Sequence, residues 1–247
     1  MQPLTLGIYR ARLTRSDAYV EQALALRQLV FRARRGLTAT PSDADRFDET
    51  CDHVLVTNTR TGDLVACCRV LRFASGACVQ QSYAAQFHDL STLHQIQQPL
   101  IELGRFCLHP DHPDPDILRL AWGLLTRLVD HDHARLLFGC TSFDGADPTP
   151  HRPALAWLAR HHLRPMPALA PDQIALAPLA AQSPDRPPPL PPLLRTYLAI
   201  GGWVSDHAVI DHDLNTLHVL TGLDVTAVPP ARARALRALA ALSHTDG

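Results

Sequence analysis

The feature that most constrains this chain is one continuous stretch at residues 99–125, PLIELGRFCLHPDHPDPDILRLAWGLL. An apolar run long enough for a buried strand leads into a loop of prolines and aspartates, and a helical pattern follows. The apolar run also contains Glu102 and Arg105. A carboxylate and a guanidinium inside a buried strand are costly unless they are paired or used in chemistry. The fold therefore has to build a polar site around this strand.

The order of elements along the chain predicts a mixed α/β (α+β) domain with a central sheet flanked by helices. The sheet is expected to have six to eight strands, with a C-terminal hairpin extension. Expected strands lie at 4–12, 53–59, 64–73, 100–108 and 135–143, with a hairpin within 207–223, and expected helices lie at 16–36, 116 onward, 152–162 and 231–243. The elements do not alternate strictly and no G-x-G-x-x-G is present, which argues against a dinucleotide-binding fold.

The division along the chain is expected near residue 164. Residues 1–164 would form the core, and residues 165–247 would complete the same domain with a proline-rich surface excursion, the late hairpin and a final helix.

Composition places the chain among soluble globular proteins. Hydrophobic residues make up 46% and charged residues 19%, and the net charge of −1 does not suggest a nucleic-acid binder. The six cysteines form no CxxC pair, and neither a signal peptide nor an apolar run near membrane-spanning length is visible. These features predict a cytoplasmic protein with free thiols.

Several ordered motifs resemble the acyl-carrier-protein (ACP)-dependent branch of the GNAT N-acyltransferases. They are similar in particular to the L-ornithine Nα-acyltransferases of bacterial ornithine-lipid synthesis and, more distantly, to acyl-homoserine-lactone synthases. The motifs are LRQLVF (26–31), DADRFDETCDHVLV (43–56), GDLVACCRVL (62–71), ELGRFCLHP (102–110), LLFGCTSF (136–143) and the late segment 190–216. VACCR departs from the glycine-threonine-tyrosine run that usually precedes this arginine. The resemblance implies a GNAT-like fold.

The implied reaction is attack of an amino acid's α-amine on an acyl thioester, which requires a base and donors for the tetrahedral oxyanion. Glu102 is the candidate base. A bulge at Gly104 would free backbone N–H groups and let Glu102 and Arg105 share a site. The structural alternative is that Glu102 only pairs with an arginine.

Candidates for substrate binding come from four segments. Arg69 and Arg105 could hold the substrate carboxylate through their planar guanidinium groups, or could instead form salt bridges. Asp48 would contact the amine or order its loop. Arg27 and Phe31 form an Arg-x-x-x-Phe element, although the apolar helix face around Arg27 favours extension of that side chain to solvent. The second ammonium of ornithine needs a carboxylate, for which the candidates are Asp45 and Asp52.

The expected acyl donor is acyl-ACP, carrying its 4'-phosphopantetheine thioester, with no bound cofactor. Prolines at the entrance of the helix that starts near Asp116 remove N–H donors, and the aspartates there repel a diphosphate, which argues against CoA. The acidic carrier protein is expected to dock on Arg32, Arg34 and Arg35. The basic helix at 231–243 predicts peripheral contact with the inner membrane, unless its leucines pack on the domain.

Other interpretations remain open. The chain could be an N-acyl amino acid synthase, an acyl-homoserine-lactone synthase, or a non-catalytic acyl-carrier or membrane-surface binding module. The His and Asp residues at 109–116 lack the spacing of a metal site, and we expect no metal there. Cys107 lacks a visible partner for a nucleophilic role, so direct transfer is favoured.

Overall fold

The computed structural model describes residues 1–37, 42–167 and 172–241. It divides into two compact units, each built from separated segments of the chain. Unit 1 comprises 1–72, 103–134 and 230–247, and unit 2 comprises 73–102 and 135–229. These units interleave along the sequence, so they do not test the expected division at residue 164, which stays a prediction.

The strands of unit 1 follow the order β1-β2-β3-β4-β5. They are β1 (Leu4–Leu6), β2 (Tyr9–Thr14), β3 (Asp52–Asn58), β4 (Leu64–Phe73) and the second part of β5 (Leu100–Leu108). The expectation of one strand at 4–12 is wrong. Gly7 takes a left-handed φ of 56°, which turns the chain tightly and pairs Leu4 with Ala11.

The helices of unit 1 begin with α1 (Asp17–Arg27), which continues through a π-helical turn (Gln28–Arg32) and a 3-10 turn (Ala33–Arg35). Gly36 ends this segment with φ 73°, which confirms the expected helix at 16–36. The second helix, α2 (Pro115–Asp132), starts at Asp114, whose side chain accepts a hydrogen bond from the Asp116 N–H. Its apolar stripe is buried as the spacing predicts.

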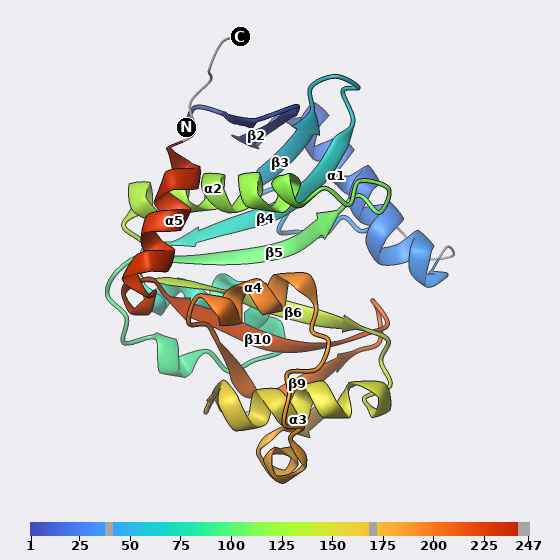
Figure 1. The fold of residues 1–247 in the computed structure, drawn as a ribbon, viewed down its shortest axis with the longest axis vertical. Helices are drawn as coiled ribbons and strands as arrows, with labels where there is room; N and C mark the ends of the chain where they lie inside the picture. Colours follow the sequence, from blue (N-terminus) through green and yellow to red (C-terminus); the bar gives the residue numbers. More distant parts are fainter. Residues whose placement is uncertain (38–41, 168–171, 242–247) are drawn as a thin grey trace. The chain divides into compact units, whose positions relative to one another are not determined.

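The last helix, α5 (Pro230–Ala240), packs against α2 (Figure 1). Arg127 on α2 donates from Nε to the Ala240 carbonyl oxygen at 2.5 Å, and Arg237 pairs with Asp130 at 2.8 Å. A Cβ at Gly123 would lie 3.1 Å from the Leu239 carbonyl oxygen, so the two backbones approach closely. The sequence left two possibilities for this helix, contact with the membrane or packing on the domain. Over Pro230–Ala240 the structure shows packing on α2.

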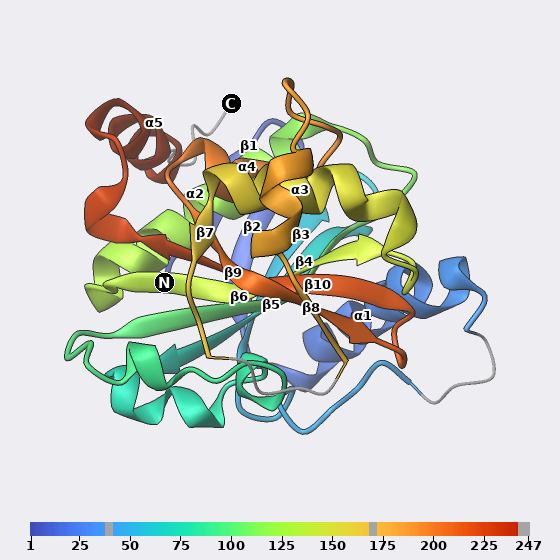
Figure 2. The ribbon, with the colours of Figure 1, turned by 90° about the horizontal axis from the view of Figure 1, so that it is seen from below.

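Unit 2 begins with the first part of β5, which pairs in parallel with β6 (Leu136–Asp144) from Leu100 to Glu102. The order continues through β10 (Thr216–Asp224), β9 (Trp203–Asp211) and β7 (Leu163–Arg164), and β8 (Gln173–Ala175) also pairs with β9. Helices α3 (Arg152–His161) and α4 (Pro192–Ala199) pack on one face of these strands (Figure 2). Their core includes Leu155, Leu158, Leu194, Ala208, Leu217 and Val219.

Two further expectations need correction. The described chain has ten strands rather than six to eight, because β1, β7 and β8 are only two or three residues long and leave little pattern. The proline-rich segment is also not simply a surface excursion. Its described part adds β8 to the sheet and buries Leu176 and Leu179.

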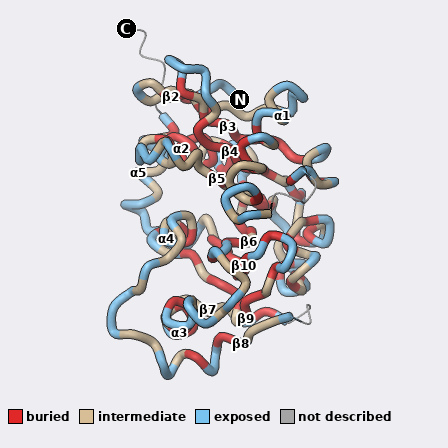
Figure 3. The backbone as a smooth tube through the Cα atoms, turned by 90° about the vertical axis from the view of Figure 1, so that its right-hand side faces the viewer, coloured by how far each residue is buried: buried red, intermediate tan, exposed pale blue. Residues whose placement is uncertain are grey.

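Buried residues follow the strands in each unit (Figure 3). Between β4 and β5 the chain forms three 3-10 turns, at Gly76–Gln81, Ala84–Gln86 and Ser91–Leu93. Among the described residues, no helix combines the length and apolarity needed to cross a bilayer.

Candidate active site

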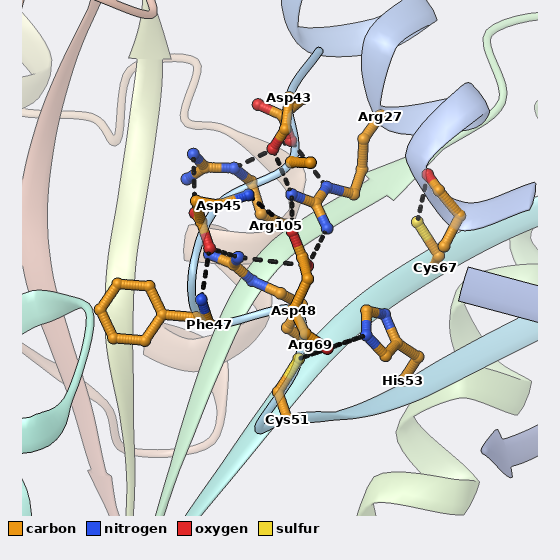
Figure 4. Close-up of polar contacts among 12 residues, drawn as sticks. Arg27, Asp43, Asp45, Phe47, Asp48, Cys51, His53, Cys67, Arg69 and Arg105 are labelled. Carbon is orange, nitrogen blue, oxygen red and sulfur yellow. Dashed lines mark hydrogen bonds and ion pairs between the residues drawn. The ribbon is translucent and has the colours of Figure 1, made fainter. Parts of the chain in front are cut away.

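A cluster of ion pairs occupies the interior of unit 1 (Figure 4). Three arginines come from different elements: α1, β4 and β5 each contribute one. Three aspartates come from the segment between the 3-10 turn at residue 35 and β3. We call this set the Arg–Asp cluster, and its members are Arg27, Asp43, Asp45, Asp48, Arg69 and Arg105.

Arg27 is fully buried, so the expectation that it extends to solvent is wrong. Its Nε donates to Asp43 Oδ2 at 2.6 Å, and its Nη1 donates to Asp48 Oδ1 at 2.5 Å. Its Nη2 also donates to the Asp43 carbonyl oxygen at 2.6 Å. Burial alone would lower the pKa of Arg27, but the bonds to Asp48 and Asp43 outweigh it and raise the pKa. This guanidinium is an anchor for the 43–48 segment.

Asp48 accepts hydrogen bonds from three directions. Besides Arg27, Arg69 approaches its Oδ1 at 3.3 Å, and the Asp45 N–H donates to its Oδ2 at 2.9 Å. Burial would raise the pKa of Asp48, but the bonds to Arg27, the Asp45 N–H and the charge of Arg69 lower it. Asp48 is therefore ionised at neutral pH and orders its own loop, which is one of the two roles expected for it.

Arg69 lies on β4 and is buried. Its Nη1 is 2.5 Å from Asp45 Oδ1, and its guanidinium stands 5.7 Å from the centre of the Phe47 ring. A Cβ added at Gly104 would be 3.8 Å from Arg69 Nε, an ordinary contact distance. Asp45 has a side chain 25% exposed, more than that of Asp43 or Asp48, so this edge of the Arg–Asp cluster is open to solvent.

Arg105 is the irregular residue of β5, with φ 51°. The sequence predicted an irregularity at Gly104, and Gly104 itself does not take a left-handed φ. Arg105 Nε donates to Asp43 Oδ2 at 3.1 Å, and Nη2 lies 3.6 Å from Asp45 Oδ2. A left-handed conformation is strained for a residue with a Cβ, and these ion pairs hold the side chain in place.

Glu102 belongs to unit 2 and is only 2% exposed. Its Oε2 accepts a hydrogen bond from the Tyr83 N–H at 2.9 Å, and its Oε1 accepts one from the Ala84 N–H at 2.7 Å. The carboxylate thus holds the start of the 3-10 turn at Ala84–Gln86. Because Glu102 and Arg105 fall in different units, their meeting in one cleft stays a prediction.

The remaining candidates lie on the helical segment after Ser16. Phe31 is half-buried and packs with the apolar cluster that contains Leu26, Leu55 and Cys67, while Arg35 stands 5.6 Å from its ring centre. Arg32 is buried, with Nε 3.7 Å from Asp43 Oδ1, so the expectation that it lies on a docking surface is wrong. Arg34 is exposed and Arg35 half-buried.

Asp43 is the residue that sequence reasoning missed. It bonds both Arg27 and Arg105, yet only its spacing with Asp45 and Asp48 in DADRFD could have marked it. Asp52, a candidate partner for a substrate ammonium, already pairs with Arg15 at 2.7 Å and Arg72 at 3.0 Å.

The Cys107 thiol lies 3.4 Å from the Cys67 Sγ, fully inside unit 1. Burial, together with the hydrogen bond to Cys67, raises the pKa of Cys107 well above its ordinary value. A thiol that resists ionisation is a poor nucleophile. This environment argues against an acyl-enzyme intermediate on Cys107.

Comparison with known proteins gives three kinds of match. An acetyltransferase (GNAT) domain matches residues 26–123. The L-ornithine Nα-acyltransferase of Rhodobacter capsulatus is 32% identical over 236 residues, covering 89% of this chain and 91% of that protein. The L-ornithine Nα-acyltransferase of Brucella abortus is 29% identical, covering 90% of this chain and 86% of that protein.

Two solved structures have a similar fold. A CoA-dependent acyl-homoserine lactone synthase, BjaI, bound to SAM and isopentyl-CoA, aligns with a TM-score of 0.51 and 10% identity, covering 95% of this chain and 89% of that one. TofI in a ternary complex with an inhibitor and MTA aligns with a TM-score of 0.51 and 13% identity, covering 93% and 98%. These matches and the GNAT domain confirm the expected GNAT-like fold.

Proposed function

Because this chain belongs to the family of L-ornithine Nα-acyltransferases, we propose that it transfers a 3-hydroxy fatty acyl group from acyl-ACP to the α-amine of L-ornithine. The product is lyso-ornithine lipid. One observation carries this proposal: the 32% identity extends over 89% of this chain and 91% of the relative. The similarity therefore reaches far beyond the acetyltransferase domain match at 26–123, which many acceptor specificities share.

In the proposed reaction, the neutral α-amine attacks the thioester carbonyl carbon. A C–N bond forms, the carbonyl oxygen becomes an oxyanion, and the C–S bond then breaks to release the carrier thiol. The amine loses its proton to a base, for which Glu102 is the candidate, directly or through a water. Backbone N–H groups beside Arg105 are the candidate oxyanion donors, which the left-handed φ of that residue supports.

The Arg–Asp cluster is the candidate acceptor site. Arg69 and Arg105 would hold the α-carboxylate, because a guanidinium binds a carboxylate in a bidentate geometry. Asp45, with its side chain 25% exposed, is the carboxylate best placed to meet the δ-ammonium. Asp43 and Asp48 are more deeply buried and would act by positioning the arginines.

The α2 entrance supports a carrier-bound donor. Asp114 occupies the N-cap position, where the free N–H groups of a helix would otherwise attract a diphosphate. Prolines 110, 113 and 115 remove further donors from the same loop. A phosphopantetheine arm carries one phosphodiester and no nucleotide 3'-phosphate, so it depends less on such an anchor.

Incubating the purified protein with 3-hydroxyacyl-ACP and a set of amine acceptors tests the proposal. Ornithine, lysine, glycine, homoserine and S-adenosylmethionine would compete in one mixture, and mass spectrometry would identify the acylated product. We expect Nα-acyl-ornithine to dominate. A product built on S-adenosylmethionine or on another amino acid would refute the ornithine assignment, and an absence of acylated product with active carrier would refute the enzymatic one.

Two comparisons test the donor and the base. Acyl-ACP should support a much higher kcat/KM than acyl-CoA, and equal values at low salt would contradict the carrier-bound donor. Glu102→Gln should lower kcat with KM for ornithine little changed, because it keeps the size of the side chain but cannot accept a proton. Near-normal turnover in this variant would leave Glu102 with only its hydrogen bonds to Tyr83 and Ala84.

A further inference from the structure

Unit 2 contains a buried cluster of imidazoles that plays no part in the proposed reaction. His88 follows the 3-10 turn at Ala84–Gln86, His207 lies on β9 and His218 lies on β10, and all three are buried. Cys140, on β6, is half-buried beside them. Three buried imidazoles and a thiol are an unusual filling for a sheet surface, since apolar side chains would fill it at lower cost.

The strand register places these residues on one face of the unit 2 sheet. His218 pairs with Ser142 on β6 and with Val209 on β9. Cys140 and His207 are each two residues from those partners, and alternate residues of a strand share a face. The opposite face carries Leu217, Val219 and Ala208, which pack against α3 and α4. The segment with His88 reaches the cluster from a different part of unit 2.

A chain of hydrogen bonds fixes the tautomers. Asp206 Oδ1 lies 3.0 Å from His207 Nδ1, and His207 Nε2 lies 3.0 Å from His88 Nδ1. A carboxylate accepts, so His207 carries its proton on Nδ1 and offers a lone pair at Nε2 when neutral. His88 then donates from Nδ1. The lone pair of His88 is therefore left on Nε2.

That lone pair is buried without a hydrogen-bond partner among the described residues. Leaving a buried polar atom unsatisfied destabilises a fold, so its presence calls for an explanation. The ligand atoms of His88, Cys140 and His218 all lie within 4.8 Å of one another. Typical zinc bond lengths put tetrahedral ligand atoms roughly 3.4–3.7 Å apart, so a small contraction would close this site.

We propose that unit 2 holds a divalent transition-metal site of the zinc type, with His88 Nε2, His218 and Cys140 as ligands and water in the fourth position. Two imidazoles and a thiolate suit zinc better than magnesium or calcium, which prefer oxygen. Asp206 and His207 are positioning residues, because a carboxylate–histidine pair behind a ligand sets its tautomer and orientation. Binding releases the Cys140 proton to solvent.

Together with Glu102, the metal would fix both ends of the segment from Tyr83 to His88. Glu102 holds the Tyr83 and Ala84 N–H groups, and the metal would hold His88 a few residues later to β6 and β10. A metal that binds the folded chain more tightly than the unfolded one adds stability by mass action. The expected role is therefore structural, within unit 2.

Unit 1 contains a second set of candidate ligands, which is less suited to a metal ion. Asp48, Cys51 and His53 also lie within 4.8 Å of one another. However, Asp48 is already engaged by Arg27 and Arg69, whose charges repel a cation. Burial also raises the pKa of Cys51 to about 12, so its thiolate forms reluctantly. This set is therefore a poor site for a metal ion.

The competing explanation for the unit 2 cluster is packing alone. The His88 ring centre lies 5.0 Å from that of His207 and 5.4 Å from that of His218, and His218 lies 5.0 Å from Phe87. If these contacts were the whole purpose, zinc would neither bind stoichiometrically nor change stability. The two explanations therefore differ in a measurable result.

The test uses the full-length chain, stripped with a chelator and then titrated with Zn²⁺ alone. We expect one zinc per chain after gel filtration, and a rise in the unfolding temperature. With Co²⁺ in place of zinc, the thiolate ligand should give a sulfur-to-cobalt charge-transfer absorption. Cys140→Ser should abolish that absorption, whereas the control Cys78→Ser, also half-buried and in unit 2, should keep it.

Two further variants distinguish a metal ligand, His88, from a positioning residue, Asp206. His88→Gln should lose stoichiometric zinc, and Asp206→Asn should weaken binding roughly 10-fold or more while leaving the metal-free protein folded. Zinc retention below one per chain in the wild type would overturn the proposal, as would stoichiometric zinc that survives Cys140→Ser unchanged. If His88→Gln fails to fold, the half-buried Cys140 variant alone decides the outcome.

Discussion

Asp43 connects three arginines through one carboxylate, although its side chain is fully buried. Arg27 and Arg105 donate to its Oδ2 at 2.6 and 3.1 Å, and Arg32 lies 3.7 Å from its Oδ1. Removing the charge would leave these buried or half-buried guanidinium groups without their common counterion. We therefore expect Asp43→Asn to reduce the free energy of unfolding by roughly 3–5 kcal/mol, measured by urea denaturation.

A matched control is available on the surface of the same unit. Asp130 pairs with Arg237 at 2.8 Å, but both side chains are largely exposed. Asp130→Asn should cost about 1 kcal/mol or less, because solvent screens exposed pairs. Similar losses in the two variants would mean that the Arg–Asp cluster is not a stabilising centre of unit 1.

His53, on β3, makes stability depend on pH. Burial lowers the pKa of this buried imidazole from its ordinary value of 6.5, against the opposing hydrogen bond to the Asp48 carbonyl oxygen. Below pH 6.5 the unfolded chain therefore takes up a proton that the folded chain refuses. The free energy of unfolding should fall as pH drops from 6.5 toward the folded pKa, by at most about 1.4 kcal/mol per pH unit from this residue.

Comparing wild type with His53→Gln isolates this contribution from that of the other buried histidines. Urea denaturation between about pH 7.5 and pH 5 should show a smaller loss of stability in the variant. Asp48 does not interfere, because its lowered pKa contributes stability that is lost only below its ordinary value of 3.8. Parallel pH dependence in the two proteins would contradict the assignment.

Several residues of the Arg–Asp cluster could be predicted from the sequence, but the ion pairs between them could not. Motif resemblance pointed to Arg27, Arg69 and Asp48, but burial of Arg27 could not be foreseen from an apolar helix face. Its partner Asp43 is 16 residues away along the chain, and Arg105 is 62 residues from Asp43. Such pairings depend on how β4, β5 and α1 meet, which local patterns do not encode.

At the scale of elements, the α1 segment offers a smaller docking surface for an acidic carrier protein than its sequence suggests. Arg34 is exposed, and Arg35 is half-buried against Phe31. Arg34→Glu should raise KM for acyl-ACP several-fold with little change in kcat, because charge steers association. The effect should shrink as ionic strength rises.

Arg32→Glu provides the contrast within the same segment. Arg32 lies beside Asp43, so reversing its charge would place two buried carboxylates together and should destabilise unit 1. Arg32→Glu should lower the unfolding temperature, and Arg34→Glu should leave it unchanged. This result would show that Arg32 stabilises unit 1 and that Arg34 acts only in docking. If KM for acyl-ACP is the same for wild type and Arg34→Glu at every salt concentration, the carrier docks elsewhere.

Long periodic elements were predictable, and short ones were not. The spacing of apolar residues gave α2 and α3 closely, and alternation or apolar runs gave β3, β4, β5 and β6. The strands β7 and β8 are too short to carry a period, and they form because β9 offers them a pairing edge. The turn at Gly7 was missed because the residues on either side read as one continuous strand.

The whole molecule assembles each unit from distant parts of the chain. Unit 1 combines the N-terminal segment, the β5–α2 segment and the last helix, while unit 2 takes the stretches between them. A division drawn from composition cannot find such units, since proline content marks local breaks and not long-range contacts. This organisation packs α5 against α2 on the surface of unit 1.

Helix α5 has a basic sequence that also suggests a membrane contact. Leu236 and Leu239 are half-buried and Ala240 is buried, while Arg232 and Arg234 are exposed. Ending the chain at Pro229 should therefore lower the free energy of unfolding by roughly 2 kcal/mol, since the two half-buried leucines lose their contacts.

Arg232→Glu with Arg234→Glu should leave stability unchanged. Because α5 packs on α2 with Leu239 against Gly123, sedimentation with anionic vesicles should be equal for this double variant and wild type. Weaker sedimentation of the folded double variant would show instead that α5 contacts the membrane surface.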